Sequence, residues 1–375
     1  MQRIGIFGGT FNPVHSEHVS LAKTAVKELN LDKLFIVPTF ISPHKSTASV
    51  SAEHRVNMLK LAFLGEDKIE ISNFEINSGG VSYSYITAER FKSDFPSAQI
   101  FLIVGADMLK DFKTWKYPQR ILNAVTLVGA KRQDFIADFS KESEYIESEY
   151  GKNVEFLTFN GESRSSTKIR VYASLGLSLS GMTSDKVQEY IKANNLYEGG
   201  LYYEYLKRVL PEKRLIHTAN VIVTALKKVK ELGLDANKVE ISALLHDVAK
   251  YQDPTSYKDF CLEEKVPSPV VHAFLGAHVC EKVLGIKDRD IINAVKYHTS
   301  GRPNMSSLEK LIFVADMVEE GRNYEGVEYL RALYENNTLD ECFRECLKEE
   351  LLHLKNKKTE IFRLTEEAYE YYAKE

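Results

Sequence analysis

The spacing of apolar residues changes near Gly199-Gly200, and this change constrains the fold more than any other feature of the chain. Before the two glycines, short apolar runs alternate with amphipathic segments, which predicts strands joined by helices and therefore a parallel sheet. After them, apolar residues recur every three or four positions and β-branched runs vanish, which predicts helices only. We therefore expect two domains, residues 1–198 and 199–375: an α/β domain followed by an all-α domain.

The expected elements of the first domain follow from these runs. The acidic, polar stretch 138–151 is interpreted as a surface excursion, and 339–375 as covering helices without chemistry. We expect strands at 3–7, 33–38, 99–104, 124–129 and 154–159, and helices at 19–29, 55–64 and 83–94.

Length and composition narrow the class of protein. A chain of 375 residues, 44% hydrophobic and 27% charged, can bury two cores and is not a disordered chain. A net charge of −4 gives no bias toward nucleic acid or a membrane surface, so we expect small-molecule partners and leave an oligomer open. There is no apolar span or signal-peptide pattern, and the four cysteines form no CxxC pair, so we expect a cytoplasmic protein.

A glycine pair follows the first predicted strand and precedes the first helix. Gly8 and Gly9 let a ligand approach the backbone closely, and the helix start offers free N–H groups to an anion. His15 and His18 are three residues apart and can face the same phosphate. Taken alone, the pattern also fits a simple turn followed by two polar surface residues.

The stretch Gly8-Gly9-Thr10-Phe11-Asn12-Pro13-Val14-His15-Ser16-Glu17-His18 resembles the (H/T)xGH motif of nucleotidyltransferases. Asn12 stands where that motif usually has Asp, and Glu17 where it usually has Gly. Four later segments are similar, in order and spacing, to the nicotinate-nucleotide adenylyltransferases of that superfamily. They are Pro43-His44-Lys45, Ser82-Tyr83-Ser84 with Thr87, Gly105-Ala106-Asp107 with Trp115, and Ser165-Ser166-Thr167-Lys168-Ile169-Arg170.

This resemblance implies a Rossmann-like nucleotidyltransferase domain that uses ATP and Mg²⁺ to adenylate nicotinate mononucleotide. It places His18 at the α-phosphate, and His15, Lys45 and Arg170 on the triphosphate. The other implied nucleotide-binding residues are Gly8, Gly9, Thr10, Phe11, Ser165, Ser166 and Thr167, and the implied acceptor-binding residues are Tyr83, Thr87, Gly105, Asp107 and Trp115. Nicotinamide mononucleotide, FMN and pantetheine phosphate remain alternative acceptors.

Five of the ten histidines lie between positions 217 and 298. His246-Asp247 ends an apolar helical run, and such a pair alone is usually structural. Further histidines and an aspartate accompany it, and imidazole and carboxylate are ligands for Fe, Mn, Co or Zn, with a carboxylate able to bridge two ions. His278 is interpreted as a packed or surface residue. The predicted ligands of two ions are His217, His246, Asp247, His272, His298 and Asp316.

This order of ligands resembles the HD phosphohydrolase superfamily, and segments 244–250, 297–303 and 313–316 with Gly321-Arg322 are similar to its YqeK-type branch. The resemblance implies symmetrical hydrolysis of diadenosine tetraphosphate to two ADP at two transition-metal ions, iron or alternatively manganese or cobalt. It gives Asp247 and Lys250 catalytic roles and assigns Lys250, Arg302 and Arg322 to phosphate. Hydrolysis of another nucleotide and a nucleotide-sensing role remain alternatives.

Overall fold

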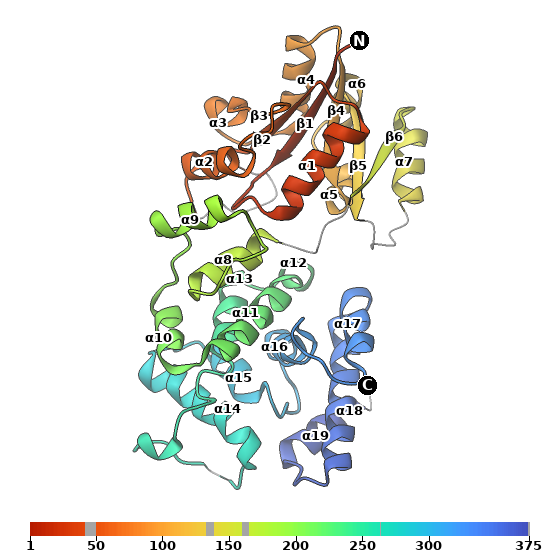
Figure 1. The fold of residues 1–375 in the computed structure, drawn as a ribbon. Coiled ribbons are helices and arrows are strands. Elements are labelled where there is room, and N and C mark those ends of the chain that lie inside the picture. Colours follow the sequence, from red (N-terminus) through yellow and green to blue (C-terminus); the bar gives the residue numbers. More distant parts are fainter. Residues whose placement is uncertain (42–49, 133–138, 160–164, 263, 374–375) are drawn as a thin grey trace. The chain divides into compact units, whose positions relative to one another are not determined.

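The computed structural model describes residues 1–41, 50–132, 139–159, 165–262 and 264–373. It divides into two compact units, Met1–Arg170 with Leu179–Tyr197, and Val171–Ser178 with Glu198–Glu375. The short segment Val171–Ser178, which the sequence places before the predicted boundary, thus groups with the second unit. Figure 1 labels the helices and strands of both units.

The first unit is built on a parallel sheet of the strand order β3-β2-β1-β4-β5-β6 in the described residues. This order confirms the predicted α/β class, and it places the switch of winding direction between β1 and β4, where ligands bind beyond the carboxyl ends of the strands. β3, only three residues long, was not predicted from the sequence. The strands are β1 (Arg3–Gly9), β2 (Lys33–Pro38), β3 (Ile69–Ile71), β4 (Gln99–Gly105), β5 (Thr126–Arg132) and β6 (Val154–Phe159).

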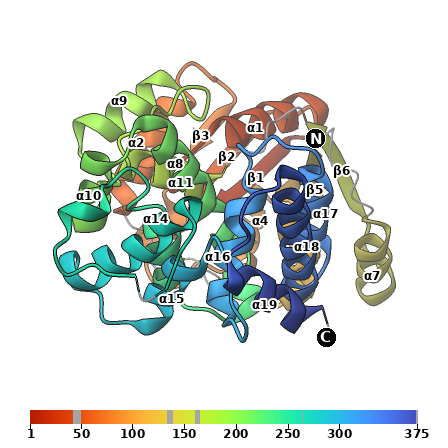
Figure 2. The ribbon, with the colours of Figure 1, turned by 90° about the horizontal axis from the view of Figure 1, so that it is seen from below.

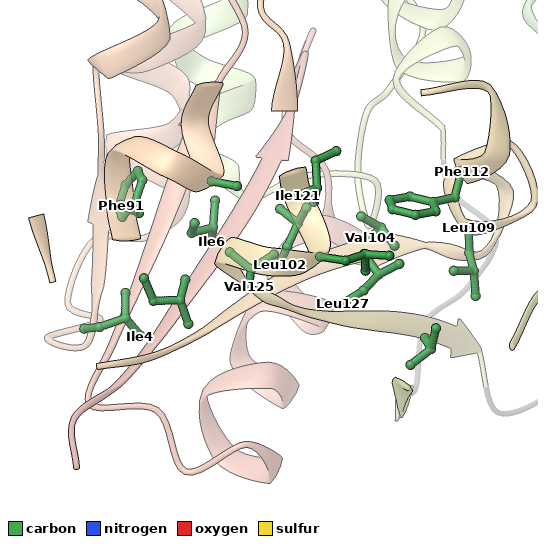
Figure 3. Close-up of a cluster of buried hydrophobic side chains, with 14 of the residues drawn as sticks. Ile4, Ile6, Phe91, Leu102, Val104, Leu109, Phe112, Ile121, Val125 and Leu127 are labelled. Carbon is green, nitrogen blue, oxygen red and sulfur yellow. The ribbon is translucent and has the colours of Figure 1, made fainter. Parts of the chain in front are cut away.

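Apolar residues fill both faces of this sheet, as expected for a parallel sheet covered by helices. Ile4 and Ile6 of β1 share one face with Leu102 and Val104 of β4, and the cluster continues into the covering helices (Figure 3). The intervening residue Gly5 has no room for a side chain, because a Cβ there would lie 2.6 Å from Leu31. The core therefore holds β1 and β4, and the loops that follow them, in a fixed register.

Helices cover the strands of this unit. One segment differs from expectation: the stretch read as a surface excursion contains α7, because Ile146 is 1% exposed and joins the core. The helices are α1 (Ser16–Glu28), α2 (Ala52–Ala62), α3 (Phe74–Ser78), α4 (Ser84–Asp94), α5 (Ala106–Lys110), the 3₁₀ turn η1 (Phe112–Thr114), α6 (Pro118–Ala124), α7 (Ser140–Tyr150), α8 (Ser166–Ser174) and α9 (Asp185–Ala193). From Val171 onward, α8 groups with the second unit.

The second unit is helical throughout its described residues, which confirms the predicted class. No described helix is both long and apolar enough to cross a bilayer. The predicted covering helices at the C-terminal end are α18 and α19, which pack against each other (Figures 1 and 2). The elements are α10 (Leu201–Val209), α11 (Glu212–Leu226), α12 (Val229–Leu232), α13 (Ala236–Leu245), η2 (Pro254–Ser256), α14 (Ser268–His278), the π-helical turn η3 (Val279–Val283), α15 (Arg289–Tyr297), α16 (Ser307–Val318), α17 (Val327–Asn336), α18 (Leu339–Lys357) and α19 (Arg363–Tyr372).

Candidate active sites

The first candidate site lies where β1 passes into α1. His15 caps the N-terminus of α1: its ring accepts from the backbone N–H of His18, and the ring of His18 accepts from the backbone N–H of His15. The two rings stack with centroids 3.6 Å apart. Gly9 is required here, since a Cβ would lie 2.9 Å from the Phe11 ring. The structure thus brings together the two histidines predicted to face one phosphate.

The loop that carries these histidines is held from the C-terminal part of the same unit. Ser166 donates to the carbonyl of Pro13 at 2.9 Å, and Arg170 donates to the carbonyl of Asn12 at 2.8 Å. Ser165 accepts from the N–H of Lys168, so its hydroxyl caps α8. The predicted nucleotide-binding segments around positions 8–18 and 165–170 therefore lie next to each other. The hydroxyl of Ser166 and the guanidinium of Arg170 also hold the loop after β1 in place.

Asn12, one of the two departures from the motif, is part of the same support. Its side chain is 7% exposed, and its Oδ1 accepts from the hydroxyl of Tyr197 at 2.7 Å. Burial raises the pKa of Tyr197, so this hydroxyl stays protonated and donates. Asn12 therefore offers the acceptor oxygen that the usual aspartate would offer. It does so without adding a buried negative charge to the loop.

Arg55 is a residue of this site that the sequence did not single out. It lies on α2, is 1% exposed, and donates to the carbonyls of Thr10 at 2.8 Å and Thr39 at 2.7 Å. These carbonyls belong to the loops after β1 and β2, so one guanidinium ties both loops together at the carboxyl edge of the sheet. A buried arginine is rare unless it is paired, and the sequence carries no signal for this contact between two separate loops.

The predicted acceptor-binding segments also meet. Lys116 lies over the ring of Tyr83 at 4.4 Å, which joins the start of α4 to the segment after η1. Trp115 packs on Phe112 with centroids 5.3 Å apart, and its buried Nε1 has no hydrogen-bond partner in the described residues. A buried indole N–H usually has a partner, so this group is an exception.

Thr87 differs from the other predicted acceptor-binding residues because its side chain is already engaged. It is 4% exposed, and its hydroxyl donates to Glu75 at 2.5 Å. Burial raises the pKa of the Glu75 carboxyl, although hydrogen bonds from Thr87 and Ser82 act against it. A direct contact between Thr87 and the acceptor substrate would therefore have to come from backbone atoms of Thr87.

Some predicted residues cannot be placed. His44 and Lys45 lie outside the described residues, and so does the side chain of Asp107. Gly105 ends β4, the strand that pairs with β1. The roles predicted for these residues stay predictions.

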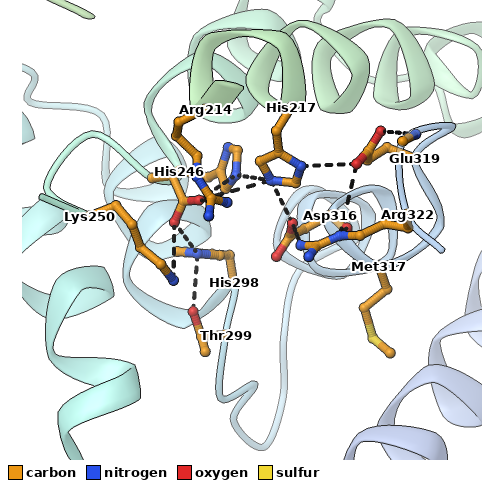
Figure 4. A network of polar contacts seen from close by, with 12 residues as sticks. Arg214, His217, His246, Lys250, His298, Thr299, Asp316, Met317, Glu319 and Arg322 are labelled. Carbon is orange, nitrogen blue, oxygen red and sulfur yellow. Dashed lines mark hydrogen bonds and ion pairs between the residues drawn. The ribbon is translucent and has the colours of Figure 1, made fainter. Parts of the chain in front are cut away.

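The second candidate site is a cluster of histidines around Asp247 (Figure 4). Oδ1 of Asp247 lies 3.1 Å from Nε2 of His272 and 3.5 Å from Nε2 of His298. Oδ2 lies 3.6 Å from Nε2 of His246 and 3.9 Å from Nε2 of His217. The two oxygens of one carboxylate thus face two different histidine pairs.

The donor set fits metal ions in size and chemistry. The ligand atoms of His217, His246 and Asp247 lie within 4.8 Å of one another, and so do those of Asp247, His272 and His298. Such a spacing suits bonds of about 2.0–2.2 Å to a central ion. Asp316 lies beside the first group: its Oδ1 is 2.9 Å from Nε2 of His217, although it is not among the ligand atoms that lie within 4.8 Å of one another. Five of the six predicted ligands therefore form the two groups, and the sixth contacts one of them.

Hydrogen bonds orient the imidazole rings. Nδ1 of His246 lies 2.7 Å from the carbonyl of Ala243, and Nδ1 of His298 lies 2.7 Å from the carbonyl of Val295. A carbonyl accepts only, so each Nδ1 carries the proton and each Nε2 is left as the ligand atom. The sequence does not reveal these bonds, although each joins residues three apart.

Metal binding needs neutral imidazole and ionised carboxylate, and His246, Asp247 and Asp316 meet this need, whereas the pKa of His217 is raised, against the effect of burial, by its hydrogen bonds to Asp316 and Glu319. Burial lowers the pKa of His246 to about 3, so this ring is neutral at pH 7. Burial alone would raise the pKa of Asp247, but His246, His272 and His298 outweigh it and hold that pKa well below its usual value. Asp316 is likewise held ionised, mainly by His217 and Arg322, against the effect of burial.

Cationic side chains surround the cluster. Nζ of Lys250 lies 3.8 Å from Oδ1 of Asp247, and the guanidinium of Arg322 donates a hydrogen bond to Oδ1 of Asp316. Two of the three predicted phosphate-binding cations are therefore at the site. Arg302 instead donates twice to buried Glu309, at 2.8 and 2.7 Å, so its charge is already balanced. Arg214, which the sequence analysis did not name, lies 2.8 Å from Oδ2 of Asp247.

His278, interpreted from the sequence as a packed or surface residue, contacts Tyr257 and Phe260 edge-on and belongs to neither ligand group of the described residues.

Glu319 is a further residue that sequence reasoning missed: it is 2% exposed, and its Oε1 lies 3.0 Å from Nδ1 of His217. In the sequence, only its position two residues before Gly321-Arg322 indicated a role at this site.

Comparisons with known proteins agree with this division. The cytidylyltransferase-like family model matches residues 6–171, and the HD domain model matches residues 214–321. A protein of Mycoplasma genitalium, named probable nicotinate-nucleotide adenylyltransferase/Ap4A hydrolase, is 30% identical over 86% of this chain and 89% of its own length. A probable nicotinate-nucleotide adenylyltransferase of Clostridium botulinum is 36% identical over 52% of this chain and 98% of its own. A crystal structure from Clostridium acetobutylicum, described as a predicted HD superfamily hydrolase involved in NAD metabolism, is 31% identical and covers 46% of this chain and 94% of its own, with a TM-score of 0.42.

Fold and sites together define the class: a nucleotidyltransferase-type α/β domain followed by a helical HD domain with a divalent-metal site. The match to the Mycoplasma protein extends through both parts. The chain belongs to the family of these nicotinate-nucleotide adenylyltransferase and HD hydrolase fusions.

Proposed function

We propose that the chain is a bifunctional enzyme that transfers AMP from ATP to nicotinate mononucleotide and hydrolyses diadenosine tetraphosphate symmetrically to two ADP. Relatives that carry these names support both halves of the proposal. The structural observation that carries it is the arrangement of Asp247, whose two oxygens face separate histidine pairs in the second unit.

In the first reaction, a phosphate oxygen of the mononucleotide attacks the α-phosphorus of ATP, the α–β bridging bond breaks, and pyrophosphate leaves. No covalent enzyme intermediate is needed, so the chain must position the reactants and neutralise charge. His18 serves the α-phosphate, while His15, Lys45 and Arg170 bind the triphosphate, with Mg²⁺ on the leaving group. The loop after β1 provides its backbone amides, and Trp115 stacks on the pyridine ring.

In the second reaction, water cleaves a phosphoanhydride bond so that each product carries two phosphates. Two transition-metal ions, iron or alternatively manganese or cobalt, would activate this water and neutralise phosphate charge when bound. His217, His246 and Asp316 would hold one ion, His272 and His298 would hold the other, and Asp247 would offer one carboxylate oxygen to each. Lys250, Arg322 and Arg214 then attract the polyphosphate to the cluster, and Arg302 keeps a supporting role through Glu309.

Assays of the purified full chain test both halves. With ATP and Mg²⁺, nicotinate mononucleotide should be the better acceptor by several kcal/mol in kcat/KM, about 10²-fold or more, because the neutral amide leaves carboxylate donors unpaired. Equal kcat/KM for acid and amide would overturn the acceptor assignment. Diadenosine tetraphosphate should give ADP as the sole product, and formation of ATP plus AMP would overturn the symmetrical cleavage.

A further inference from the structure

His217 differs from its neighbours in how its ring is oriented. His246 and His298 donate Nδ1–H to carbonyls of Ala243 and Val295, three residues earlier in their own segments. His217 lies inside α11, and its Nδ1 is 3.0 Å from Oε1 of Glu319, which follows α16. The ring of His217 is thus oriented by a carboxylate from another element (Figure 4).

Glu319 is itself held rigidly. Its Oε2 accepts from the backbone N–H of Gly321 at 2.5 Å, and Asn220, one turn after His217 on α11, also hydrogen bonds to the carboxylate. Arg331 of α17 donates to the carbonyls of Val318 and Glu319 at 2.9 and 2.6 Å. The backbone and both carboxylate oxygens are therefore fixed, so the carboxylate cannot follow a displaced ring.

We propose that Glu319 is a positioning residue for one of the two metal ions, the ion of the His217, His246 and Asp316 group. By accepting from Nδ1–H, it leaves Nε2 of His217 as the ligand atom and makes this ring a stronger donor. The ion of the His272 and His298 group does not depend on Glu319, because the ring of His298 is held by a backbone carbonyl and Nδ1 of His272 lies 3.4 Å from Nζ of Lys250. This inference rests on the dinuclear site of the proposed function and goes beyond it by making the two ions unequal.

Titration of the metal-free full chain with Co²⁺ tests the inference. Calorimetry gives the number and affinity of the ions, and the visible Co²⁺ spectrum reports ligand geometry. Glu319→Gln keeps the size of the side chain and removes its charge. Glu320→Gln, at an exposed position next in the chain, is the matched control. A far-ultraviolet circular dichroism melt of each metal-free variant shows whether the helices remain folded.

We expect two ions in the wild type and in Glu320→Gln, and in Glu319→Gln a loss of affinity for one ion of roughly 10- to 100-fold, with the other unchanged. The Co²⁺ spectrum of the weakened site should change as well. Unchanged affinity for both ions in Glu319→Gln would overturn the inference and leave the proposed function standing. Equal weakening of both ions, or loss of the helical signal, would overturn it by making Glu319 structural. A wild-type chain that binds no Co²⁺ would overturn both proposals.

Discussion

Oδ1 of Asp316 lies 2.9 Å from Nε2 of His217, so α16 and α11 place a carboxylate and an imidazole at the same point. Burial lowers the pKa of His217, but the hydrogen bonds to Asp316 and Glu319 outweigh it and raise that pKa above its usual value. A proton therefore competes with a metal ion for His217, and metal binding at this group should weaken as the pH falls.

His18→Ala should lower adenylyl transfer by about 10²–10⁴-fold, the range for loss of a positioned group that stabilises the transition state. The reason is its position at the start of α1, stacked on His15. Steady-state rates with ATP and nicotinate mononucleotide measure the effect. His54→Ala is the control, since His54 bonds to Tyr190 instead. A His18 variant that keeps more than a tenth of the wild-type kcat would remove this role.

Arg55→Met should destabilise the first unit by about 2–5 kcal/mol, because it leaves the carbonyls of Thr10 and Thr39 without donors, at about 1–3 kcal/mol each. The KM for ATP should rise too, since the loop after β1 loses its anchor. Urea unfolding can be followed by the fluorescence of Trp115, the single tryptophan of the chain.

Arg90→Met is the matched control for this change. Arg90 forms an exposed ion pair with Asp94, and its loss should change stability by less than about 1 kcal/mol. If the Arg55 and Arg90 variants unfold at the same urea concentration, the buried guanidinium does not anchor the two loops.

Glu75→Gln should stabilise the first unit at pH 8 and have little effect at pH 4. Burial raises the folded-state pKa of Glu75 above its unfolded value of 4.5. A carboxyl with a raised pKa contributes stability below its unfolded pKa and loses it as the pH rises through the folded pKa. Gln removes this loss and keeps an oxygen that can accept from Thr87.

The thermal midpoint from Trp115 fluorescence at the two pH values measures this difference. Glu70→Gln, at an exposed ion pair with Lys33, is the control and should shift little with pH. A Glu75→Gln variant that is less stable than the wild type at pH 8 would show that the carboxyl is ionised and stabilising in the folded protein.

The sheet and both motif-bearing regions were predictable because they are encoded locally. Four predicted strands coincide closely with β1, β2, β4 and β6, since each is a short segment rich in apolar residues. β3 has three residues and α7 has a single buried apolar residue, Ile146, so neither produces a clear periodic pattern. Their existence is decided by packing against the rest of the sheet.

The site could be predicted as far as its motif residues and no further. His217 and Asp316 were expected as ligands, but Glu319, Arg214 and Arg55 were not, because each acts through a contact between elements distant in the sequence. The ion pair between Arg302 and Glu309 could not be predicted for a related reason. The sequence shows a basic residue in a motif, but it does not show which acidic residue lies beside it.

The bridging role of Asp247 is the central claim, and metal analysis of the full chain with both activities measured on the same samples tests it most directly. The wild type should hold two transition-metal ions per chain. Asp247→Ala should bind neither ion at the wild-type affinity and should lose diadenosine tetraphosphate cleavage, because one carboxylate serves both ions. Dinucleotide synthesis by this variant should continue at its Mg²⁺-dependent rate. One ion or none in the active wild type, or full hydrolysis by Asp247→Ala, would contradict the dinuclear account.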